Sequence, residues 1–181
     1  MTERRLTLTA EVDEAIRRHG REAYPHECCG ALVGRDGHVT AVLALPNATE
    51  EGPRRRFLVR SSDYRLAERR ATELDAELVG FYHSHPDHPA RPSQYDLDHA
   101  WPTFAYVIVA VAGDGLARRR GDLSRQSADL SRQSAEGATA EGATAGDMTV
   151  WYLKDDRSRF LEGSLHHGEN SHSDPAQAVH R

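Results

Sequence analysis

The chain contains few of the residues that build disulfide frameworks or membrane spans. Its only cysteines are Cys28 and Cys29, which are adjacent, cannot form a disulfide framework and suit a reducing compartment. No apolar stretch is long enough to cross a bilayer, and the N-terminal MTERRLTLTA lacks the apolar core of a secretion signal. These absences argue against a disulfide-stabilised secreted scaffold, and we expect a cytoplasmic protein with no membrane partner.

Lysine is almost missing as well. Lys154 is the single lysine, and the arginine and alanine content is typical of a GC-rich bacterial genome. The formal net charge is -5 and the isoelectric point is near 6.1. Because this charge is negative, we expect no nucleic-acid partner and no general affinity for anionic surfaces.

What is present is the composition of a globular protein with a repeated segment inside it. With 181 residues, 38% hydrophobic and 28% charged, the chain is long enough for one domain with its own core. DLSRQSA occurs twice and EGATA then follows twice, between residues 122 and 145. These units have too few large apolar residues to offset the entropy of ordering them. We therefore predict a domain at 1–165 with a disordered insertion at about 114–147, and a disordered tail at 166–181.

Three helices are expected from hydrophobic periodicity and capping residues. The first spans 10–23, the second is opened by Ser62 and Asp63, and the third starts near Ser93. On the second helix, one buried face is predicted, formed by Ala67, Ala71, Leu74 and Leu78.

Apolar runs predict strands between and after these helices. The expected ranges are 31–33, 38–45, 57–59, 78–83, 104–112, 148–153 and 159–161. The first two are joined through Asp36 and Gly37, a strong hairpin signal. The range 104–112 (FAYVIVAVA) is continuous enough to be buried on both faces. This alternation of strands and helices predicts a single α/β or α+β domain.

One motif carries most of the chemical information. The run HSHPDHPARPSQYD contains His83, His85, Ser93 and Asp96 at His-x-His-x7-Ser-x2-Asp spacing. Residues i and i+2 of a strand point the same way, so the two imidazoles can meet at one point, and Asp96 can return a carboxylate to it. Two histidines and one carboxylate leave a position for water, as in catalytic zinc sites. The spacing of Ser93 and Asp96 also fits a simple helix capping box.

Together with Glu27 in YPHECCGALVG, this motif resembles the JAMM (MPN-plus) zinc metalloprotease family. The resemblance covers about residues 6–112 and 148–165. It implies a JAMM/MPN-like domain with a central mixed β-sheet flanked by helices, in a cytidine-deaminase-like layout. It also implies one Zn²⁺ per chain, held by His83, His85 and Asp96. Glu27 would be the catalytic general base, and the Ser93 hydroxyl would stabilise the oxyanion.

The resemblance further implies a substrate class. Relatives cleave an amide bond after the C-terminal glycine of a ubiquitin-like β-grasp protein, and the bacterial form of the Glu27 segment favours a sulfur-carrier conjugate, for example one that releases cysteine. The alternative is a desampylase- or deubiquitinase-like isopeptidase that acts on lysine conjugates. The amide bond, rather than the identity of the carrier, is what the motif indicates.

Two other functions compete with this interpretation. His83 to His88 formally fit His-x-His-x-Asp-His, the metal-binding run of metallo-β-lactamase-like hydrolases, which would use Asp87 and His88 as ligands. A non-catalytic MPN scaffold is the third possibility, although all the motif residues are present. Around the motif, we expect Ser84 to point to the opposite face of its strand, and Cys29 to be a buried apolar side chain.

Overall fold

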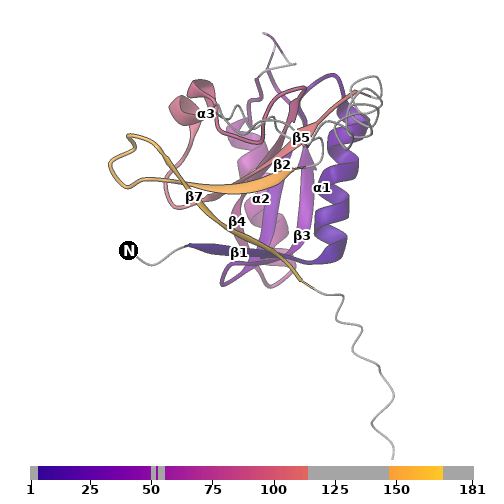
Figure 1. Ribbon diagram of the computed structural model, residues 1–181. Helices are drawn as coiled ribbons and strands as arrows, with labels where there is room; N and C mark the ends of the chain where they lie inside the picture. The colour runs from indigo at the N-terminus through magenta and orange to yellow at the C-terminus, as the bar shows by residue number, and fades with distance from the viewer. Residues whose placement is uncertain (1–3, 50–51, 53–55, 114–146, 169–181) are drawn as a thin grey trace, which may run out of the picture.

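The computed structural model describes residues 4–49, 52, 56–113 and 147–168. The repeats between residues 122 and 145 lie outside these ranges, as do most of the predicted insertion and tail. The described strands form one closed barrel in the order β1-β3-β2-β4-β5-β6-β7 (Figure 1). They are β1 (Arg5–Leu8), β2 (Cys29–Arg35), β3 (His38–Leu45), β4 (Glu77–Pro86), β5 (Ala105–Val111), β6 (Met148–Leu153) and β7 (Phe160–His167). The helices are α1 (Ala10–Ala23), α2 (Ser61–Glu73) and α3 (Gln94–His99).

The sheet is mixed, as predicted. Strand β1 runs parallel to both β3 and β7, and β4 runs parallel to β5, whereas the remaining pairs are antiparallel. Strand β4 lies between β2 and β5, so its backbone is hydrogen-bonded on both sides. The mixed α/β single domain is therefore confirmed, with the addition that the sheet closes on itself.

Local sequence explains α1 and the first hairpin. The Thr9 side chain accepts a hydrogen bond from Val12 N at 3.3 Å and caps α1. The helix ends where predicted, and it packs against β3, β4 and β5. Asp36 and Gly37 join β2 to β3 with φ of 51° and 75°, the left-handed conformation that a two-residue hairpin turn requires.

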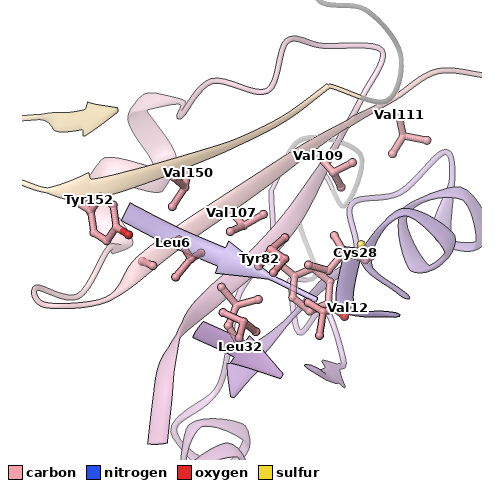
Figure 2. Packing of buried hydrophobic residues seen from close by; sticks show 14 residues of the cluster. Leu6, Val12, Cys28, Leu32, Tyr82, Val107, Val109, Val111, Val150 and Tyr152 are labelled. Atoms are coloured by element: carbon pink, nitrogen blue, oxygen red, sulfur yellow. The ribbon is translucent and has the colours of Figure 1, made fainter. Parts of the chain in front are cut away.

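Strand β4 separates two hydrophobic clusters. Tyr82 points into the cluster on the α1 side together with Leu32 and Val107 (Figure 2). Phe81 points the other way, into a cluster with Tyr106 and residues of α2. Both faces of β4 are therefore buried. Because side chains alternate along a strand, His83 and His85, two and four residues after Phe81, lie on the same face as Phe81.

Two details around α2 differ from the prediction. Residues 57–59 form no strand and pair with no other strand among the described residues. Helix α2 begins at Ser61 and its N-cap is Arg60, which makes no side-chain cap hydrogen bond. Ala67 and Ala71 are buried as predicted, but Leu74 is 47% exposed because the helix has ended there, and residue 78 belongs to β4.

The last strand is longer than expected. Strand β7 continues to His167, past the predicted end at residue 161 and into the predicted tail. It does so because it pairs in parallel with β1, with Arg5 opposite Ser164, and closes the barrel. His167 Nδ1 also lies 3.2 Å from the Asp13 carboxylate of α1, so this histidine has a partner. Within the described ranges, no helix combines the length and apolar character needed to traverse a bilayer.

Candidate metal centre

Three buried side chains meet at the end of β4. His83 and His85 point from the same face of the strand, and Asp96 reaches them from the first turn of α3. His83 Nε2 lies 3.0 Å from His85 Nε2 and 3.4 Å from Asp96 Oδ1, and His85 Nε2 lies 3.7 Å from Asp96 Oδ2. All three ligand atoms lie within 4.8 Å of one another. The predicted ligands are therefore brought together, in an arrangement that could hold a metal ion.

Hydrogen bonding and burial set the protonation of the two rings. A carbonyl oxygen can only accept, so His85 Nδ1 donates to Pro89 O at 2.8 Å, and in the neutral ring the lone pair of His85 Nε2 faces His83. Burial lowers the pKa of His83 to about 3, against the opposing effect of Asp96, so this ring is neutral near pH 7. Burial also lowers the pKa of His85, but its hydrogen bonds to Asp96 and Pro89 and the charge of Glu27 outweigh burial and raise the pKa above its usual value. Two imidazole nitrogens and a carboxylate are the ligands that catalytic zinc prefers. The residues present fit that ion.

Ser93 and Asp96 form the capping box that their spacing predicted. Ser93 N and Oγ each donate to Asp96 Oδ2 at 2.6 Å, and Asp96 N donates to Ser93 Oγ at 3.2 Å. Burial alone would raise the pKa of Asp96, but His83, His85 and Ser93 outweigh it and hold the pKa below its usual range. The carboxylate is thus charged and fixed in direction. The Ser93 hydroxyl can donate only one hydrogen bond, and in this structure it donates that bond to Asp96 Oδ2.

Glu27 lies next to this group but outside it. Its side chain is buried in the loop between α1 and β2, and it lines a hollow of about 350 Å³ with His85 and Ser93. Burial raises the pKa of Glu27 to about 8, with a lowering contribution from His85 and a raising one from Asp96. A carboxyl group with such a pKa can both accept and release a proton near neutral pH.

Asn47, which the sequence analysis did not single out, holds two parts of the site together. Its Nδ2 donates to Glu27 O at 3.1 Å and to Arg56 O at 3.0 Å. Its Oδ1 accepts from the backbone N–H groups of Thr49 and Leu58, both at 3.2 Å. The amide therefore fixes the backbone of Glu27 and both ends of the 47–58 segment. No local signal marks Asn47, because its side chain bonds backbone groups up to 20 residues away.

The 47–58 segment places an aromatic ring, that of Phe57, against His83. The Phe57 ring stacks on the His83 ring with 4.4 Å between centroids and 25° between planes. His83 Nδ1 is buried and has no hydrogen-bond partner among the described residues. Phe57 was predicted to lie in a strand; instead, its ring covers one side of the group formed by His83, His85 and Asp96, called the metal group below.

The 87–93 loop is held by β5 and β6. Thr149 Oγ1 donates to the Ala90 carbonyl, and Trp151 Nε1 donates to Thr149 Oγ1 at 2.7 Å. The Asp87 carboxylate accepts from Tyr24 OH at 3.0 Å and from Gly113 N at 3.3 Å. Asp87 thus has a structural role, and neither it nor His88 belongs to a metal-holding group in the described part of the chain. The geometry gives no support to the metallo-β-lactamase-like alternative.

The remaining residues near the motif have packing roles. Ser84 points to the opposite face, as predicted, where its Oγ accepts from Cys28 N at 2.9 Å. Cys29 is a buried apolar side chain, also as predicted, and its Sγ contacts Leu45 O at 3.6 Å. Burial raises the pKa of Cys28 to about 11 and that of Cys29 to about 12, so both thiols stay neutral.

Comparison with known proteins gives consistent matches. A family model described as prokaryotic homologues of the JAB domain matches residues 9–122. A desampylase of Haloferax volcanii is 33% identical over 120 residues, which cover 62% of this chain and 86% of that protein. A CysO-cysteine peptidase of Mycobacterium tuberculosis is 29% identical over 106 residues, 58% of this chain and 73% of that protein.

Two solved structures resemble the fold. A protein from Salinibacter ruber is 32% identical with a TM-score of 0.57, and the match covers 97% of both chains. A protein from Desulfitobacterium hafniense is 25% identical with a TM-score of 0.64, covering 91% of this chain and 93% of that one.

Proposed function

Because the chain belongs to the family of prokaryotic JAB-domain homologues and is a hydrolase of peptide or isopeptide bonds, we propose that it is a zinc peptidase. Its proposed substrate is a ubiquitin-like sulfur-carrier protein, which it would cleave after the C-terminal glycine. The observation that carries the proposal is the position of Glu27. Its carboxyl group is buried beside the His83, His85 and Asp96 group, yet it is not a member of that group, so it remains available to move protons.

The proposed roles follow from these positions. His83, His85 and Asp96 would hold a zinc ion, which would supply a Lewis acid for the reaction. Glu27 accepts a proton from the attacking water as the new C–O bond forms at the scissile carbonyl carbon. Glu27 then gives that proton to the leaving nitrogen as the C–N bond breaks, so that a carboxylic acid and an amine are released, and proton transfer from the acid to the amine leaves a carboxylate and an ammonium group.

Ser93 has two functions in this proposal. Its backbone N–H keeps Asp96 in place, since that bond to Oδ2 does not depend on the hydroxyl. Its hydroxyl can then turn from Asp96 toward the substrate oxygen as negative charge develops there. The contact with Asp96 is the resting position of the same donor.

A lysine isopeptidase is the second candidate. The observation in its favour is the desampylase of Haloferax volcanii, which matches with higher identity than the CysO-cysteine peptidase. Both candidates place a ubiquitin-like protein on the acyl side of the scissile bond, and they differ only in the amine that leaves.

Incubation with two conjugates tests the proposal. The zinc-loaded full chain is mixed with carrier–cysteine and carrier–lysine conjugates, and release is followed by mass spectrometry. Glu27→Gln should lower turnover by about 10²- to 10⁴-fold or more, while elemental analysis still finds one zinc per chain. The matched control is Glu11→Gln, a change at an exposed glutamate of α1. Release from neither conjugate, or a Glu27→Gln variant as active as the control, would refute the proposal.

A further inference from the structure

The hollow that contains Glu27 also carries an unused positive charge. Arg91 lines it together with His85 and His88. The Arg91 side chain is exposed and forms no ion pair with any residue in the described ranges. The carboxylate of Asp87 is occupied by Tyr24 and Gly113. The guanidinium is therefore free to bind an anion that enters the hollow.

The backbone of Arg91 is well fixed for such a role. Its N–H donates to Pro89 O at 2.8 Å, and the same carbonyl accepts from His85 Nδ1. The preceding residue, Ala90, is buried and its carbonyl accepts from Thr149. The backbone of Arg91 is thus fixed relative to His85, so only the rotamers of its side chain have to be ordered when the guanidinium binds an anion.

The leaving residue is the part of the substrate that should meet this charge. A group that protonates the leaving nitrogen has to lie within hydrogen-bond reach of it, so that nitrogen enters the hollow of Glu27. In a C-terminal amino acid, the α-carboxylate is two bonds from that nitrogen. In a lysine isopeptide, four methylene groups separate the nitrogen from a backbone that carries no free carboxylate. Only the first kind of substrate brings an anion into the hollow.

We infer that Arg91 binds the free α-carboxylate of the leaving residue and so selects conjugates that end in a single amino acid over lysine isopeptides. A planar guanidinium pairs with a carboxylate through two parallel hydrogen bonds, which gives both affinity and direction. The inference rests on the proposed function, because it requires amide cleavage beside Glu27. It adds the residue that distinguishes the two leaving groups.

The test removes the anion from the substrate and the cation from the enzyme separately. Carrier–cysteine and the same conjugate with a C-terminal carboxamide are each given to wild type, Arg91→Gln and the control Arg65→Gln, which changes an exposed arginine of α2. Wild type and the control should prefer the carboxylate by about 10- to 100-fold in kcat/KM, mainly through KM. Arg91→Gln should lose that preference and cleave the carboxamide as wild type does, with unchanged zinc content.

Binding gives a second measurement without turnover. In a Glu27→Gln background, the Kd of the carboxylate conjugate should rise by a similar factor on Arg91→Gln, and the Kd of the carboxamide should stay constant. Equal use of both conjugates by wild type, or an equal loss for both on Arg91→Gln, would overturn the inference and leave the proposed function standing. Failure of wild type to cleave any conjugate would reject the proposed function and this inference with it.

Discussion

Replacement of Asn47 by alanine should damage both stability and turnover, because its side chain holds the backbone of Glu27, the proposed general base, and the segment that places Phe57 over His83. Four hydrogen bonds are lost, two donated to carbonyls and two accepted from N–H groups. Each contributes about 0.5–1.5 kcal/mol net, and water can replace part of them at the exposed end of the segment. We expect the free energy of unfolding to fall by about 2–4 kcal/mol.

The effect on turnover has a separate cause. Without Asn47, the Glu27 backbone loses the donor that fixes it, and a displacement of about 1 Å of a catalytic group can cost about 10²-fold. Asn47→Asp separates the two halves of the amide: it keeps both accepted bonds but replaces both donated bonds by a charge facing carbonyl oxygens. The repulsion between that charge and the carbonyl oxygens offsets the two accepted bonds, so Asn47→Asp should recover neither the stability nor the turnover.

Urea denaturation of the zinc-loaded protein and cleavage of the carrier conjugate measure the two effects. The control is Thr72→Ala, which removes one exposed bond to Glu68 O on α2 and should change stability by less than about 0.5 kcal/mol. An Asn47→Ala variant that unfolds like this control and keeps full turnover would refute the reasoning.

Two further predictions concern metal and pH. Zinc at about 100 times its Kd should raise the free energy of unfolding by about 2.7 kcal/mol, measured by denaturation with and without a chelator. Asp96→Ala should abolish that increase, and an undiminished increase would contradict the ligand assignment. Burial lowers the pKa of His19, against a smaller raising effect of Glu22, so the unfolded chain binds this proton more readily and stability should fall as pH drops below about 6.5. His19→Gln should flatten this dependence in zinc-loaded protein, and an unchanged slope would count against it.

Features that depend on neighbouring residues were predictable from the sequence. The alternation of His83 and His85 on one strand, the capping of α3 by Ser93 and the turn at Asp36 all follow from spacings of one to three residues. The backbone geometry of a strand, a helix end or a tight turn is sufficient to place such side chains. The grouping of His83, His85 and Asp96 could be predicted for this reason.

Features that depend on distant partners were not predictable in the same way. Asn47 gains its importance from Glu27 and Leu58, and nothing in the residues around it indicates those partners. Residues 57–59 are apolar enough to suggest a strand, but the structure uses Phe57 to cover a histidine instead. The length of β7 follows from its pairing with β1, at the opposite end of the described chain.

Closure of the barrel affects how a polypeptide can be recognised. Every described strand has a neighbour on each side, but the pairing does not run the full length of each strand: β1 pairs with β3 only at His38 and Val39, whereas β2 pairs with β3 as far as Leu45. Within the described barrel, addition of a peptide through main-chain pairing, the mode that many peptide-binding domains use, is therefore restricted to such partly paired stretches. The same closure shortens the exposed edges from which unwanted association between copies could start. For the proposed substrate, side chains and the loops around the barrel therefore offer most of the contact surface, so recognition would depend more on the sequence of the substrate tail than on its backbone.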